Sequence, residues 1–369
     1  MSKNSQSITK AAIRQNLAPV LSFLEDPSIS EILINGPFEI FIERQGKLEK
    51  TTAQFPDEDS LRAALNSIAN DVGRRIDDDQ PRLDARLPDG SRIAAVIPPC
   101  SLNGTVISIR KFTQNNISFK DYVKSGSLSS DGAQFLDLCM FLGKNILVSG
   151  GTGSGKTTLL SLLCSRIPKG QRLIVIEDSS ELSINYEHVV RFETRQANQI
   201  GDGEVSMKDL LKSSLRLRPD RIIVGEVRSS EALELINAMN TGHKGCLGTV
   251  HANSPEDAIV RLEALAQGGD AKISEKALRF QVASAIDLIV QVSRYQDGSR
   301  RIAAINEVIG LRDDGGYEVL PIFAMSRMVR QPDGKLLGQL EPTGHTPSFM
   351  QEIIDNNLPF PAAKFSKVG

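Results

Sequence analysis

The sequence predicts an α/β protein with two domains, and three observations support this. The chain has 369 residues, more than one ordinary hydrophobic core accommodates. Residues 17–112 combine short β-patterned runs with helical ones, whereas from residue 132 to 369 strand and helix patterns alternate, as in a mostly parallel sheet. A stretch rich in Ser, Asn and Gly at 113–131 is expected to be the linker, and polar residues 1–16 a flexible segment.

The composition indicates a globular protein without a basic bias. Hydrophobic residues make up 40% and charged residues 24%, and the net charge is -2, so no nucleic-acid partner is expected. The four cysteines are far apart and predict neither a disulfide nor a zinc site. Residues 1–16 lack an apolar core, and the most apolar segment, 135–142, is too short to cross a bilayer.

The amino-terminal domain is predicted to be a small antiparallel sheet with helices. Asp26-Pro27 ends a first helix, because proline disfavours helix in the residue before it. Leu61, Leu65 and Ile68 recur on one face of a second helix, and Pro88-Asp89-Gly90 is a turn between strands. The expected elements are helices over 17–24 and 58–71 and strands over 31–34, 39–43, 82–87, 91–97 and 105–110.

The second domain is predicted to alternate strands and helices. Ser254 caps one of its helices and Pro255 occupies the first turn, where its missing N–H costs nothing. Asp297-Gly298 predicts a turn into a hairpin over 300–309, followed by a β appendage and a short terminal helix. Strands are expected near 145–149, 172–176, 221–225, 245–250 and 288–292, and helices over 157–167, 206–215, 231–239, 255–266 and 275–286.

A glycine-rich run at 150–158 matches the phosphate-loop pattern G-x-x-x-x-G-K-T and lies between a strand pattern and a helix pattern. Its glycines let backbone N–H groups point at phosphate oxygens, at the positive end of the following helix. We expect Lys156 to reach the β- and γ-phosphates of ATP and Thr157 to hold Mg²⁺. The expected nucleotide-binding residues are Gly151, Thr152, Gly153, Ser154, Gly155, Lys156, Thr157 and Thr158.

Acidic and histidine side chains follow other predicted strands, and ligands of parallel sheets bind at the carboxyl ends of strands. Asp178 and Glu181 follow the second strand, and we expect them to serve water and magnesium. Glu226 follows the third strand after Gly225, where an aspartate is usual, and it is favoured as the catalytic carboxylate, although the sequence does not separate it from Glu181. His251 is expected to sense the γ-phosphate.

Arginines concentrate in the amino-terminal domain, on or beside its turns. Arg82, Arg86, Arg92 and Arg110 each fit a solvated face when taken singly. Together they are candidate phosphate donors, and Arg86, Arg92 and Arg110 are expected to contribute to catalysis.

These motifs, in this order, resemble the secretion superfamily of hexameric ATPases that serves type II secretion, type IV pili and type IV secretion. The phosphate loop is shared with many families, whereas three further motifs discriminate. They are Glu177-Asp178-x-x-Glu181, Val224-Gly225-Glu226-Val227-Arg228, and Thr249-x-His251 leading to Arg261. Within the superfamily the chain is most similar to CpaF-type ATPases of tight-adherence (Tad, or Flp) pili, through residues 35–37, 86–92, 108–112 and 218–221.

The resemblance implies a RecA-like P-loop motor domain preceded by a smaller, PAS-like α/β domain. It also implies a homo-hexamer in which one subunit's amino-terminal arginines complete a neighbour's site, with catalytic roles for Lys156, Glu181, Glu226 and His251. Such ATPases work at the cytoplasmic face of the inner membrane, associate with it peripherally and are held by a membrane platform protein. The alternatives are a type IV secretion ATPase and a nucleotide-binding scaffold without turnover.

Overall fold

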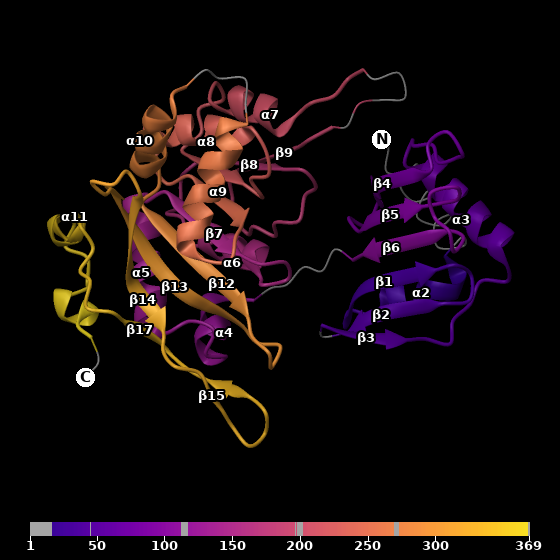
Figure 1. The fold of residues 1–369 in the computed structure, drawn as a ribbon, viewed down its shortest axis with the longest axis horizontal. Helices are drawn as coiled ribbons and strands as arrows, with labels where there is room; N and C mark the ends of the chain where they lie inside the picture. Colours follow the sequence, from indigo (N-terminus) through magenta and orange to yellow (C-terminus); the bar gives the residue numbers. More distant parts are fainter. Residues whose placement is uncertain are drawn as a thin grey trace. The chain divides into compact units, whose positions relative to one another are not determined.

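The structure is a computed structural model that describes residues 17–44, 46–111, 117–195, 197, 202–268 and 273–367. The chain divides into two compact units, Met1–Gln114 and Asn115–Gly369, each with its own core (Figure 1). The segment expected to be flexible, 1–16, lies outside the described residues.

The first unit is a six-stranded antiparallel sheet in the order β3-β2-β1-β6-β5-β4. Its elements are η1 (Ala18–Val20), α2 (Leu21–Glu25), β1 (Ile29–Asn35), β2 (Ile40–Arg44), β3 (Lys47–Lys50), α3 (Glu58–Asp71), β4 (Arg82–Arg86), β5 (Arg92–Val96) and β6 (Val106–Arg110). The helix predicted over 58–71 is present with those bounds. Asp57 caps it by accepting from the N–H of Ser60, and its apolar stripe is buried. Strand β3 was not predicted, because its four residues are exposed and carry no alternating pattern.

Side chains alternate between the two faces of this sheet. Ile93 and Ile109 are directly opposite each other on β5 and β6, and both are fully buried. The residues next to each isoleucine along its strand point to the other face, because the side-chain period of a strand is two. Arg92 and Arg110 therefore share the face that does not carry the core.

The second unit contains a nine-stranded sheet in the order β17-β14-β13-β12-β7-β11-β10-β8-β9. The strands from β12 to β9 are parallel, as predicted, whereas β13, β14 and β17 extend the sheet with antiparallel pairs. The strands are β7 (Ile146–Gly150), β8 (Leu173–Glu177), β9 (Val189–Glu193), β10 (Arg221–Val224), β11 (Leu247–His251), β12 (Leu288–Arg294), β13 (Arg300–Leu311), β14 (Tyr317–Met325) and β17 (Leu340–Pro342).

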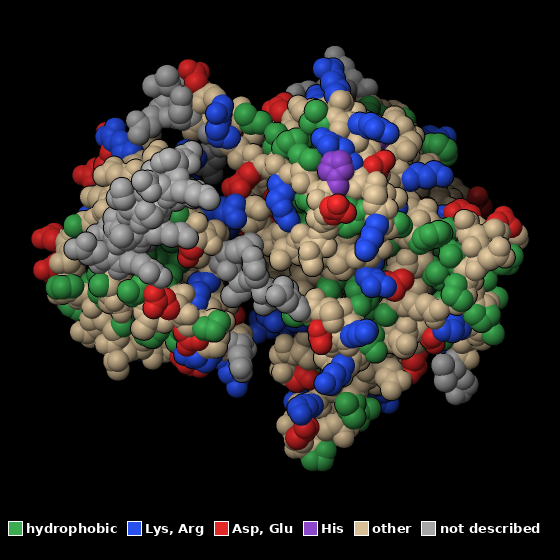
Figure 2. All heavy atoms as spheres, turned by 180° about the vertical axis from the view of Figure 1, so that it is seen from behind, with side chains coloured by type: hydrophobic (Ala, Val, Ile, Leu, Met, Phe, Trp, Pro, Cys, Tyr) green, Lys and Arg blue, Asp and Glu red, His purple; other side chains and the backbone are tan. Residues whose placement is uncertain are grey.

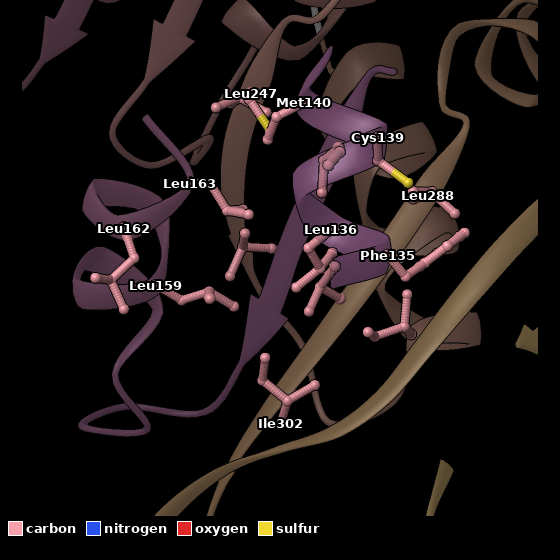
Figure 3. Close-up of a cluster of buried hydrophobic side chains, with 14 of the residues drawn as sticks. Phe135, Leu136, Cys139, Met140, Leu159, Leu162, Leu163, Leu247, Leu288 and Ile302 are labelled. Atoms are coloured by element: carbon pink, nitrogen blue, oxygen red, sulfur yellow. The ribbon is translucent and has the colours of Figure 1, made fainter. Parts of the chain in front are cut away.

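Helices cover both faces of this sheet and bury two apolar clusters. Along β7, Ile146 and Val148 belong to one cluster and Leu147 to the other. The first cluster lies under α5 and α6 (Figure 3), and the second under α7 to α10. The helices are α4 (Phe119–Lys124), α5 (Ser130–Leu142), α6 (Lys156–Cys164), α7 (Met207–Ser214), α8 (Glu231–Asn240), α9 (Pro255–Gln267), α10 (Glu275–Ala285) and α11 (Met350–Asp355).

The prediction of a linker over 113–131 is wrong for residues 118–131, because these residues belong to the second unit. Ser118 and Asp121 form a capping box that starts α4, and Ser129 caps α5. Tyr122 and Leu128 are buried in the first apolar cluster. Two of the serines that suggested a solvated linker, Ser118 and Ser129, are therefore helix caps, a role for which serine is equally suited.

The carboxyl-terminal residues form the predicted β appendage and helix. A small hairpin of β15 (Val329–Arg330) and β16 (Leu336–Leu337) precedes β17, α11 and a final 3₁₀ turn, η2 (Ala362–Phe365). This segment packs on α5 through an aromatic cluster around Phe135, whose ring centroid lies 5.6 to 6.1 Å from those of Phe323, Phe349, Phe360 and Phe365.

Across the described residues, the surface mixes charges and the helices are too short or too polar to cross a membrane. No described helix is long and apolar enough to span a bilayer. Figure 2 shows basic, acidic and hydrophobic side chains interspersed on the face that it draws.

Candidate nucleotide-binding site

The glycine-rich loop connects the fully buried β7 to the first turn of α6. Gly153 and Gly155 have φ angles of 67° and 100°, a region that side chains other than glycine rarely adopt. A Cβ on Gly150 would lie 2.4 Å from the carbonyl oxygen of Val292, so this position requires glycine for space. The backbone therefore has the curled shape that aims successive N–H groups at an anion.

Lys156 folds back onto the loop that precedes it. Its Nζ donates to the carbonyl oxygens of Gly150 at 2.9 Å and Gly151 at 3.0 Å. Burial lowers the pKa of Lys156, while the charge of Glu226 raises it and that of Arg228 lowers it. The lysine is thus within electrostatic reach of the residues that follow β10.

The sheet brings the phosphate loop, His251 and the residues that follow β8 and β10 to one edge. β7 lies between β11 and β12, and His251, the last residue of β11, is in register with Gly150. On the next strands, Val224 of β10 is in register with Ile176 of β8, so the residues after them emerge together. This is the carboxyl edge of the parallel strands, where such sheets bind ligands.

Glu177 organises the acidic turn after β8, a role that sequence reasoning missed. It is only 3% exposed, and its Oε1 accepts the backbone N–H groups of Glu181 at 2.8 Å and Leu182 at 2.9 Å. Burial raises the pKa of Glu177 despite these hydrogen bonds, which lower it. A Cβ on Gly225 would lie 2.9 Å from Cγ of Glu177, which explains glycine where an aspartate is usual.

Arg228 joins the two acidic motifs. Its Nη1 lies 3.2 Å from Oδ2 of Asp178, and its Nε donates to Oε2 of Glu226 at 2.8 Å. Partial burial lowers the pKa of Arg228, but the bond to Glu226 and the nearby carboxylates raise it above its usual range. Sequence reasoning quoted this arginine only as part of a motif, although a cation two residues after a strand-end glutamate is a usable signal.

The donor set fits a magnesium ion that is held mainly by a nucleotide. The described residues contain no group of three or more His, Cys, Asp or Glu side chains arranged to hold a metal. Magnesium in nucleotide sites keeps waters and takes one or two protein oxygens together with phosphate oxygens. Thr157 follows Lys156 in the first turn of α6, and Asp178 and Glu181 follow β8, so hydroxyl and carboxylate oxygens are available without an all-protein cage.

The predicted arginines form a row in the first unit. Arg86 is in register with Arg92, and Arg92 with Arg110, at one end of β4, β5 and β6. Nη2 of Arg92 lies 3.7 Å from Oδ2 of Asp84, and Nε of Arg86 donates to the carbonyl of Gly90 at 3.3 Å. Arg82 lies at the other end of β4, outside the row.

A phosphate loop between a central parallel strand and a helix, with carboxylates after the neighbouring strands, defines a P-loop nucleotide-binding protein. The family described as type II/IV secretion system protein matches residues 14–307, and the chain belongs to this family.

Named relatives agree with this assignment. A conjugal transfer protein TrbB of Rhizobium radiobacter is 35% identical over 296 residues, which cover 79% of this chain and 87% of the relative. A type IV secretion system protein VirB11 of Bartonella quintana is 32% identical and covers 78% and 91%. The pilus retraction motor PilT with bound ADP has a similar fold, with a TM-score of 0.55, 20% identity and coverage of 92% and 85%. The chain is thus an ATP-hydrolysing enzyme with a RecA-like second unit.

Proposed function

We propose that this ATPase works as a homo-hexameric ring that couples hydrolysis of Mg-ATP to movement of its first unit against its second. It powers assembly of a tight-adherence type IV pilus at the cytoplasmic face of the inner membrane, where a platform protein holds it. The motifs at 35–37, 86–92, 108–112 and 218–221 support the pilus. A type IV secretion system is the second candidate, because TrbB and VirB11 are among the relatives.

The arginine row of Arg86, Arg92 and Arg110 carries the proposal of a ring. The register gathers three positive side chains at one end of the sheet, and such a row attracts an anion. Nη2 of Arg92 also lies 3.7 Å from Oδ2 of Asp84. The guanidinium group is suited to bind phosphate oxygens in pairs. The glycine-rich phosphate loop belongs to the second unit, so a nucleotide on a neighbouring subunit is the anion that we propose.

The chemistry of phosphoryl transfer explains why an arginine beside the nucleotide would help. Charge spreads over three oxygens of the group in transit, and an arginine supplied there accelerates the reaction by roughly 10³ to 10⁵. Lys156 supplies one cation from the same subunit. Arg228 is a second cation in that subunit, but Glu226 and Asp178 already neutralise it. The row would therefore add positive charge to that of Lys156 at the transferred group.

The remaining roles follow from position at the carboxyl edge. Glu226 orients or deprotonates the attacking water, and Asp178 and Glu181 serve water and magnesium together with Thr157. His251, in register with Gly150, senses the γ-phosphate. The backbone of residues 151–158 surrounds the phosphates.

A subunit-mixing experiment tests the ring. Lys156→Ala and Arg92→Ala proteins are each expected to be inactive, and mixed rings should regain part of the activity because intact loops meet intact arginines across interfaces. Arg82→Ala is the matched control, since Arg82 lies on the same strand as Arg86 but outside the row, and it should stay active alone. No recovery despite demonstrated subunit exchange would refute the shared site.

A genetic experiment separates the two systems. A strain that carries only the Lys156→Ala chain should lose surface pili under the first proposal. Under the second it should keep its pili and lose transfer of DNA or protein to recipient cells.

A further inference from the structure

We propose that Arg300 is a positioning residue that holds the phosphate loop in its binding conformation; this rests on the nucleotide-binding role of the loop. Arg300 begins β13, and its Nε donates to the carbonyl oxygen of Gly153 at 2.9 Å. A Cβ built on Gly155 would lie 3.4 Å from Cδ of Arg300, so the side chain lies along the loop.

Because the peptide bond is planar, the bond from Arg300 to the carbonyl of Gly153 also fixes the next N–H group. The carbonyl of Gly153 and the N–H of Ser154 belong to one trans peptide unit and point in opposite directions. Holding the carbonyl on Arg300 therefore fixes the direction of the N–H of Ser154. In this structure the N–H of Ser154 makes a long bond of 3.4 Å to the carbonyl of Gly151, which a phosphate oxygen can replace. Because the loop binds phosphate through such N–H groups, Arg300 orients a ligand donor that it does not itself provide.

Two neighbours line the same side of the loop. Arg294 ends β12 in register with Arg300, and a Cβ on Gly153 would lie 3.7 Å from its Nη1. Tyr122 of α4 reaches the loop as well, with its hydroxyl 3.7 Å from a Cβ built on Gly155. The loop is thus supported by a strand pair and a helix that are distant in sequence.

The turn that presents Arg300 is fixed by its own hydrogen bonds. The N–H of Tyr295 donates to the carbonyl of Ser299 at 2.8 Å, which closes the turn. Oδ1 of Asp297 accepts the N–H of Ser299 at 3.0 Å and its hydroxyl at 2.6 Å. Gly298, with a φ of 83°, supplies the conformation that this turn requires.

The β15–β16 hairpin anchors this turn from the outside. Oδ2 of Asp297 accepts the N–H of Leu336 at 2.9 Å. Arg301, only 7% exposed, donates to the carbonyls of Leu336 and Gly338, the latter at 3.3 Å. Asp297 and Arg301 thus bind the hairpin to this turn, and Arg300, next to Arg301, binds the turn to the phosphate loop.

The test uses the full-length chain with Arg300→Ala, and with Arg330→Ala as the matched control. Arg330 is exposed and donates to Gln296 of the same turn at 2.9 Å. Without nucleotide, Arg300→Ala should speed hydrogen exchange of amides 151–156. It should weaken binding of ADP and GDP by the same factor, roughly 3- to 10-fold, the net effect of one typical hydrogen bond. Arg300→Lys, which keeps a donor, should recover part of the loss, and Arg330→Ala should match the unsubstituted chain.

Three outcomes would overturn the proposal. Unchanged loop exchange would mean that Arg300 does not hold the loop. A loss confined to ADP would identify a direct contact with the base, and an equal effect of Arg330→Ala would indicate general weakening of the appendage. None of these readouts requires hydrolysis or a ring, so they are independent of the mixing experiment; failure of the unsubstituted chain to bind ADP would instead refute its nucleotide-binding role.

Discussion

At the residue scale, Glu177 and Gly225 fit each other on neighbouring strands. The buried carboxylate holds the turn that carries Asp178 and Glu181, and the glycine leaves room for its side chain. The glycine after β10, where an aspartate is usual, is thus a packing requirement, and Glu226 is the first carboxylate after this strand.

Gly225→Ala should lower the free energy of unfolding by about 1–3 kcal/mol, because its Cβ would overpack against Glu177. Chemical denaturation of the full-length chain measures this change. Gly151→Ala is the control for stability, since nothing lies within 4 Å of a Cβ there. Equal stability of the Gly225→Ala chain would show that the turn relaxes without cost.

Glu226→Gln should slow ATP hydrolysis by roughly 10² to 10⁴ while ADP affinity changes little, because the amide cannot accept a proton. Steady-state turnover and ADP titration together measure the two effects. Arg228→Gln is the comparison, since it breaks the bond to Glu226 and keeps that carboxylate. If both variants lose the same activity, the loss comes from breaking this pair and Glu226 is not the base.

At the element scale, the β12–β13 turn and the β15–β16 hairpin are connected through Asp297. Burial raises the pKa of Asp297, but its hydrogen bonds with Ser299 and Leu336 and the charge of Arg301 lower it to about 2. The folded pKa lies below the ordinary 3.8, so the ionised carboxylate stabilises the fold above about pH 4 and this contribution is lost as pH falls toward 2.

Asp297→Asn should therefore destabilise the chain by about 1.5–3 kcal/mol at pH 7, the range for a hydrogen bond to a charged group. Urea denaturation at several pH values should show the difference shrinking below pH 4. Asp333→Asn is the matched control, because Asp333 accepts a similar turn bond from Lys335 at 3.1 Å on the exposed hairpin. A pH-independent difference would exclude the charge as its cause.

Strong apolar patterns predicted most of the second unit, whereas short or exposed elements escaped sequence reasoning. The buried runs of β7 and β8 allow few alternatives. Strand β9 has five half-buried or exposed residues and helix α4 has only six residues, so neither carries an apolar pattern long enough to detect.

Sequence patterns also predicted only part of the candidate site. Glu226 and His251 were predicted near the loop because strand ends converge in a parallel sheet. Arg300 was not predicted near the loop. It lies 147 residues from Gly153 in sequence, and only the antiparallel extension of the sheet brings the two together.

At the scale of the whole molecule, two units with separate cores carry complementary chemistry. The first unit presents Arg86, Arg92 and Arg110, and the second the phosphate loop and its acids. Under the proposed ring, the active enzyme is an assembly.

Specific activity should therefore fall on dilution, as rings dissociate, while ADP affinity per chain stays nearly constant. Turnover measured across concentrations, alongside sedimentation, tests this expectation. Constant activity per chain in dilutions where sedimentation finds only monomers would contradict it. Arg92→Ala should remove the concentration dependence by removing the activity, without weakening ADP binding.

The two outermost strands of the nine-stranded sheet have a consequence for solubility. In the described residues β17 has three residues and ends in Pro342, which lacks an N–H, and β9 carries the charges of Arg191 and Glu193. Short, proline-containing or charged edges resist pairing with the strands of another chain. Copies crowded at high local concentration are thus protected from fibrous aggregation through their sheets, and remain free to associate through other surfaces.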